Sequence, residues 1–162
     1  MKLNIRIKDL FSLFLALFMA IILVNCGGDK DESTDDTVQP TFSSLYNKVF
    51  VSACVSCHAP GESAYDTDGV IIDFRTAAQA YTDLTTRSST GPGSGVCNGT
   101  AYIAADAADS YLAAVVVEDV ATSFNVGGCT TPLATHYNGL TSLSAAEINA
   151  LSQWINNGAQ NN

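Results

Sequence analysis

Hydrophobic residues recur at helical spacing in four stretches of the chain after residue 40. The first stretch predicts a helix from the N-cap Thr41 to Cys54, with the apolar positions Phe42, Leu45, Tyr46, Val49 and Phe50. Thr76 caps a second predicted helix, whose shared face is made of Ala77, Ala80, Tyr81 and Leu84. A third predicted helix begins at Asp109 or Ser110 and carries Tyr111, Leu112, Ala114 and Val115.

The fourth stretch has the clearest helix signals in the chain. Ser144 and Glu147 are spaced as a capping box, and Leu143 and Ile148 stand at the two positions of a hydrophobic staple. We expect this helix to continue to Gly158, because a residue without a Cβ suits the left-handed position after a helix.

The segments between these helices are expected to be irregular. Residues 59–68 and 88–95 are rich in turn-forming residues, which predicts two loops, the second of them exposed. The apolar run 70–74 has no partner run, so we expect extended packing instead of a sheet. Residues 121–141 are also expected to be irregular. With no internal repeat and no well-marked strand, the sequence predicts an all-α domain.

The N-terminus has the pattern of an export signal. Basic residues precede an apolar run over residues 10–24, which is shorter than the roughly 20 residues of a membrane-spanning helix. The run ends in Leu-Val-Asn-Cys, which resembles the lipobox of bacterial lipoproteins and implies that Cys26 is the lipidated first residue of the mature chain. Asn25 departs from the small residue usual there, and an uncleaved membrane anchor is the alternative. Both interpretations export the domain.

Three segments follow from this pattern: a signal peptide over 1–25, a flexible acidic tether over 26–40 and one folded domain over 41–160. From Cys26 onward the chain has four basic and fifteen acidic side chains, a net charge of −11. A surface so acidic disfavours nucleic acid as a partner. We expect the Asp and Glu side chains to be scattered over a solvated surface.

The cysteine spacing is the most specific chemical signal. Cys54, Cys57 and His58 form a C-x-x-C-H pattern, which is typical of covalent haem attachment. Two thiols three positions apart can add to the two vinyl groups of one porphyrin, which places His58 under the iron. With Cys26 lipidated, Cys97 and Cys129 remain, and a disulfide is the simplest expectation in an exported chain.

Other interpretations of these residues stay open. A redox dithiol at Cys54 and Cys57 normally lies in a βαβ setting, which the sequence does not indicate. A zinc site made of Cys54, Cys57, His58 and His136 is compatible with the spacing. Cys97 and Cys129 are alternatively two unrelated buried thiols.

Four motifs together resemble exported bacterial cytochromes c of class I type, especially the small lipoprotein forms. They are Phe-x-x-Leu-Tyr over 42–46, Cys-Val-Ser-Cys-His over 54–58, Asp-Ser-Tyr-Leu over 109–112 and the C-terminal pattern over 143–159. The resemblance implies a small helical domain with long loops around one covalent haem c. It implies thioethers at Cys54 and Cys57, iron ligation by His58, and packing of the C-terminal helix on the N-terminal one through Trp154.

The second axial ligand departs from that family's pattern. These cytochromes usually supply a Met, but the only Met residues here are Met1 and Met19, both in the signal peptide. Thr131-Pro132 stands at about the place of the usual Met-Pro pair. Two options remain: His136 completes a bis-His iron, or the sixth position is open or holds water.

The ligand decides the expected function. Bis-His iron predicts a one-electron carrier that works with redox proteins in the periplasm or membrane and is held to a lipid membrane through Cys26. An open site predicts a five-coordinate haem protein that binds a small ligand or peroxide, as a sensor or weak peroxidase. The sequence has no other catalytic motif. Either Arg75 or Arg87 is expected to pair with a haem propionate. A third class, a haem-free structural lipoprotein, requires the C-x-x-C-H match to be accidental.

Overall fold

The computed structural model describes residues 37–66, 72–90, 92–130 and 143–162, all within one unit that spans 37–162. The predicted signal peptide, Cys26, the Thr131-Pro132 pair and His136 lie outside the described residues. The predicted tether is described only from residue 37 onward.

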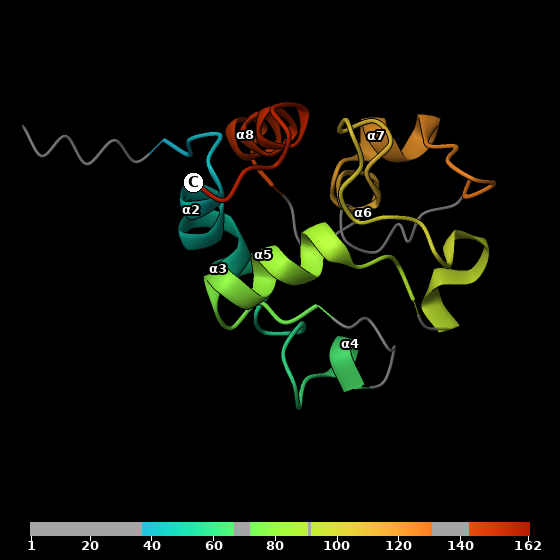
Figure 1. The fold of residues 1–162 in the computed structure, drawn as a ribbon, viewed down its shortest axis with the longest axis horizontal. Helices are drawn as coiled ribbons and strands as arrows, with labels where there is room; N and C mark the ends of the chain where they lie inside the picture. Colours follow the sequence, from blue (N-terminus) through green and yellow to red (C-terminus); the bar gives the residue numbers. More distant parts are fainter. Residues whose placement is uncertain (1–36, 67–71, 91, 131–142) are drawn as a thin grey trace, which may run out of the picture. The chain divides into compact units, whose positions relative to one another are not determined.

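A helix leads from Thr41 to the C-x-x-C-H segment, as the hydrophobic pattern predicts (Figure 1). It consists of α2 (Phe42–Leu45), the π-helix η2 (Tyr46–Phe50) and α3 (Val51–Ala53). The Thr41 side chain accepts a hydrogen bond from the amide of Ser44, which makes it the N-cap. All five predicted apolar positions of this helix are buried. The π turn is a finding of the structure, because the apolar spacing alone does not distinguish it from an α turn.

The remaining described elements are also helical. They are α4 (Ser63–Asp66), α5 (Ala77–Thr86), the 3₁₀ helix η3 (Pro92–Cys97), α6 (Tyr111–Val116), α7 (Glu118–Ser123) and α8 (Ala145–Asn156). In the part of the chain that the structure describes, β pairing is limited to two isolated bridges, Ser88 with Ala101 and Val126 with Cys129. The described residues therefore form a small all-α domain, as predicted.

Local capping chemistry sets the starts of α5 and α8. The Thr76 hydroxyl accepts a hydrogen bond from the amide of Gln79, as expected of an N-cap. At α8 both bonds of the Ser144–Glu147 capping box are present. Gly158, just after α8, has a φ of 87°, the left-handed conformation that its lack of a Cβ allows.

Three short helices lie at least partly in segments whose sequence predicts irregular structure. The helix α4 lies inside 59–68, η3 begins inside 88–95, and α7 runs into 121–141. The prediction that 88–95 is exposed holds at Thr90 and Gly95 but is wrong at Ser89 and Ser94, which are buried. The Ser94 hydroxyl donates to the carbonyl of Thr90, 2.7 Å away, so a polar loop satisfies its own backbone while it packs.

The N-terminal and C-terminal helices of the described residues pack against each other, as the family resemblance implies. The helices α2 and α8 lie side by side in Figure 1 and are in contact. The Phe42 and Trp154 rings lie 5.6 Å apart between centroids, and Trp154 is only 1% exposed. The Trp154 indole N–H donates to the carbonyl of Gln160, so its one polar group is satisfied.

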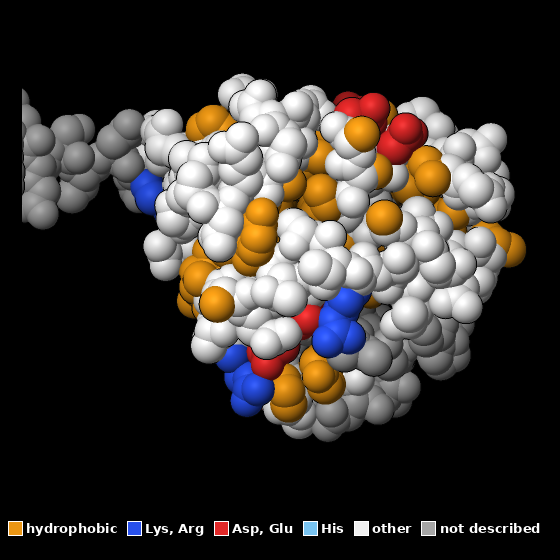
Figure 2. Space-filling view, in the orientation of Figure 1, with side chains coloured by type: hydrophobic (Ala, Val, Ile, Leu, Met, Phe, Trp, Pro, Cys, Tyr) orange, Lys and Arg blue, Asp and Glu red, His pale blue; other side chains and the backbone are white. Residues whose placement is uncertain are grey.

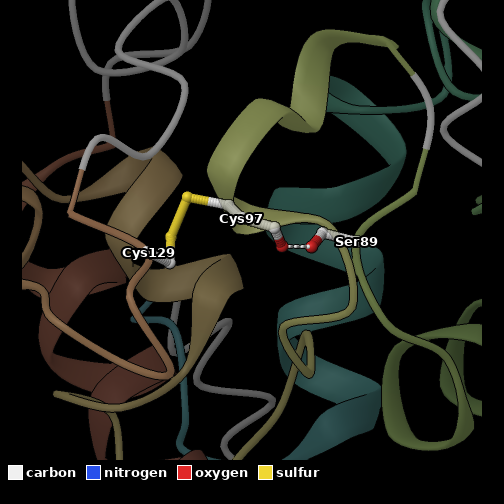
Figure 3. The surroundings of a disulfide bond; sticks show 3 residues. All are labelled: Ser89, Cys97 and Cys129. Carbon is white, nitrogen blue, oxygen red and sulfur yellow. Dashed lines mark hydrogen bonds between the residues drawn. A yellow bond between two sulfur atoms is a disulfide. The ribbon is translucent and has the colours of Figure 1, made fainter.

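A disulfide joins Cys97, the last residue of η3, to Cys129 (Figure 3). The two residues are 32 positions apart, and both are fully buried. Beside the bond, the Ser89 hydroxyl donates to the Cys97 carbonyl, as the dashed line in Figure 3 shows. The predicted pairing is therefore present, and it ties the 88–97 loop to the bridge that follows α7.

No helix of the described ranges is both long enough and apolar enough to cross a membrane.

Candidate functional site

The C-x-x-C-H segment lies at the end of α3 as one hydrogen-bonded turn. The Cys54 amide donates to the Phe50 carbonyl at 2.9 Å, which closes the last turn of the helix. The Cys54 carbonyl then accepts from the amides of both Cys57, at 3.2 Å, and His58, at 2.9 Å. This turn places Cys54, Cys57 and His58 at one helix end.

The two thiols of this turn are in different surroundings. Neither forms a disulfide; Cys57 is exposed, whereas Cys54 is partly buried and packs against the core. Burial, with a smaller contribution from nearby Cys57, raises the pKa of Cys54 to about 12. The raised pKa keeps this sulfur in the thiol form at neutral pH, so that a bound metal ion or a nucleophilic reaction would have to displace its proton.

The zinc alternative also needs His136, which lies outside the described residues. Within the described ranges, no three His, Cys, Asp or Glu side chains are grouped so that they could hold a metal ion.

His58 is buried at the edge of the core. It is 9% exposed, and its Nδ1 atom is shielded from solvent. Its ring meets the Phe74 ring edge to face, with centroids 5.9 Å apart. Its backbone carbonyl accepts the Phe74 amide at 3.0 Å. Phe74 thus contacts both the backbone and the side chain of the proposed iron ligand.

Phe74 belongs to residues 72–75, which we call the Phe74 strap. Residues 72–74 are buried without forming a helix, in agreement with the extended packing predicted for 70–74. Residues 70 and 71 lie outside the described residues. The Tyr46 hydroxyl donates to the Phe74 carbonyl at 3.0 Å. The Asp73 amide donates to the Asp83 carboxylate, also at 3.0 Å. The strap is therefore bonded to η2 on one side and to α5 on the other.

One ion pair lies within the strap, and a second involves the carboxylate that anchors it. Arg75 contacts Asp73 at 2.7 Å, and Arg87 contacts Asp83 at 2.6 Å. Basic and acidic side chains adjoin on the face shown in Figure 2. Hydrogen bonds from Arg75 hold the pKa of Asp73 below its ordinary value. Pairing of Arg75 or Arg87 with a haem propionate stays a prediction.

The expectation of a purely solvated acidic surface is wrong for Asp73 and Asp83. Asp83 is 1% exposed, and it also accepts a hydrogen bond from Gln79 at 2.9 Å. A signal for this was available, since Gln79 and Arg87 stand four positions before and after Asp83, on the same helix face. No comparable signal links Tyr46 or Phe74 to His58.

No protein-family model matches the chain, and no curated protein or solved structure matches it either.

Proposed function

We propose that this chain is an exported mono-haem c-type cytochrome, anchored to a lipid membrane through Cys26, that carries single electrons between redox proteins of the periplasm or membrane. The observation that supports it best is the turn over 54–58, which presents two free thiols and a buried imidazole at the end of one helix. Haem c supplies an iron that changes between the ferric and ferrous states.

The chemistry of the donor set fits that group. Cys54 and Cys57 are both free to form thioethers, and thioether formation consumes a thiol without requiring a charged sulfur in the product. The His58 imidazole is a usual proximal ligand for iron. Its apolar neighbour Phe74 and the partly buried Val55 suit a macrocycle that is largely kept from water.

The surface charge fits a protein partner. From Cys26 onward the chain carries a net charge of −11, so a partner with a basic docking surface would be attracted to it before contact. Electron carriers meet their partners through small and transient interfaces, for which a fast encounter matters more than tight binding.

A second candidate function follows from the missing Met. Since Met1 and Met19 both lie in the predicted signal peptide, the mature chain has no Met side chain that could bind the iron. Without ligation by His136, the sixth position would accept a small ligand or peroxide, and the chain would be a sensor or weak peroxidase.

Absorption spectra and a redox titration of the exported, purified chain distinguish these functions. A carrier is expected to be low-spin in both oxidation states and to titrate with a slope of about 59 mV per tenfold change in the ratio of the two states. A high-spin ferrous form that binds carbon monoxide readily would support the second candidate instead. Absence of a haem spectrum from a correctly exported chain would contradict both.

A further inference from the structure

Phe74 lies between the proposed iron ligand and the helix that leads to it. Its amide donates to the His58 carbonyl and its carbonyl accepts the Tyr46 hydroxyl, each at 3.0 Å. The centroid of its ring lies 5.9 Å from that of His58 and 5.3 Å from that of Phe50. Both backbone polar groups of this residue are therefore bonded to different segments.

The neighbouring residue of the strap is anchored independently. The Asp73 amide donates to the Asp83 carboxylate, and that carboxylate is paired with Arg87, the C-cap residue of α5. Asp83 thus fixes the start of the strap, whereas among the described residues the Tyr46 hydroxyl is the side-chain donor to the Phe74 carbonyl itself. Loss of the Tyr46 hydroxyl would leave the Asp83 anchor in place.

We propose that Tyr46 is a positioning residue for His58. Its hydroxyl fixes the Phe74 carbonyl and thereby holds the Phe74 amide and ring against the backbone and imidazole of His58. The inference rests on the proposed function in one respect, which is that His58 is the iron ligand.

The physical reason is that a ligand ring is oriented by the groups around it. Residues that hold a metal ligand in place tune the metal without touching it. The Tyr46 hydroxyl is buried, as is the carbonyl that it meets, so removing it leaves an acceptor without that donor inside the core. The strap would then open more readily near Phe74, and the edge contact with His58 would lose its fixed geometry.

Hydrogen exchange in the full chain, purified as the exporting host makes it, tests the contact. In Tyr46→Phe we expect the Phe74 amide to exchange about 5- to 30-fold faster relative to the slowest amides of the buried helix α6, as loss of one buried hydrogen bond predicts. The matched control is Tyr81→Phe, because the Tyr81 hydroxyl also donates to a backbone carbonyl, that of Ala159, at 3.0 Å. The control should leave the relative exchange rate at Phe74 unchanged.

The iron environment gives the readout that a merely structural role would not move. With haem bound, Tyr46→Phe should change the ferric electron paramagnetic resonance spectrum and shift the reduction potential, whereas Tyr81→Phe should change neither. If the two variants have the same ferric spectrum, or if Tyr46→Phe speeds exchange at Phe74 and in α6 by the same factor, the inference is wrong although the proposed function stands. If the chain carries no haem, the proposed function fails while the exchange comparison still decides the contact.

A second variant covers the case in which Tyr46→Phe does not fold. Phe74→Leu keeps the backbone bonds of the strap and removes the aromatic edge beside His58. The expected result is an altered ferric spectrum, with the backbone amide at position 74 still protected from hydrogen exchange. An unchanged spectrum would overturn the inference.

Discussion

Loss of the Cys97–Cys129 disulfide is expected to remove a large share of the stability of this domain. The bond closes a loop between residues 32 positions apart, and the chain-entropy relation gives about 3.7 kcal/mol at 25 °C for a loop of that size. Domains of ordinary size are stable by only about 5–15 kcal/mol in total. Both cysteines are fully buried, so we choose Ala as the replacement, because it introduces no hydroxyl that needs a partner.

The assay is urea unfolding of Cys97→Ala, Cys129→Ala and the double variant, followed by circular dichroism. Each single variant should lose the same free energy of unfolding, and the double variant should lose little more, because one bond is removed in all three. With a slope of about 2 kcal/mol/M, the midpoint should fall by roughly 2 M. As the control, a reducing agent should lower the wild type to the level of the variants and leave the variants unchanged.

Two outcomes would contradict the predicted contribution of the disulfide. Additive losses in the double variant would show that Cys97 and Cys129 act separately. A wild type that unfolds identically with and without reductant would show that no reducible bond joins them.

Three further predictions concern charge, capping and ligation. The pKa of Asp73 is lower in the folded chain than in the unfolded one, so the Arg75–Asp73 pair adds stability that is present above about pH 4 and lost as the pH falls through the folded pKa. The loss of unfolding free energy caused by Asp73→Asn, measured with urea, should therefore shrink on acidification, and a loss independent of pH would contradict this prediction. Ser144→Ala should cost about 1 kcal/mol in the same assay by removing the N-cap of α8, against no such loss for Ser152→Ala within the helix. His136→Ala should convert a low-spin ferric spectrum into a high-spin one if His136 is the second axial ligand, and an unchanged low-spin spectrum would exclude that role.

The helices with strong local signals could be predicted from the sequence. Thr41, Thr76 and Ser144 each cap a helix through a bond to an amide three residues on, and such a bond depends only on nearby sequence. The short helices α4 and α7 were missed because a segment of four to six residues has too few positions to show a helical period.

The candidate site could be predicted only in its local part. The order of Cys54, Cys57 and His58 is visible in the sequence, and so was a reason to pair Cys97 with Cys129. The contact of Phe74 with His58 joins residues 16 positions apart through packing, which no spacing rule predicts. The burial of Asp83 likewise depends on where the Phe74 strap meets α5.

The central claim is that haem is bound covalently through Cys54 and Cys57. For the most direct test, the full chain is expressed through a periplasmic cytochrome c maturation pathway and denatured. Haem is then measured on the separated chain and on the peptide that contains residues 54–58. We expect haem on that peptide, and its loss from the chain in a Cys54→Ala, Cys57→Ala double variant but not in Cys97→Ala. A haem-free chain that has been correctly exported would contradict covalent haem attachment and leave disulfide or zinc chemistry as the role of these residues.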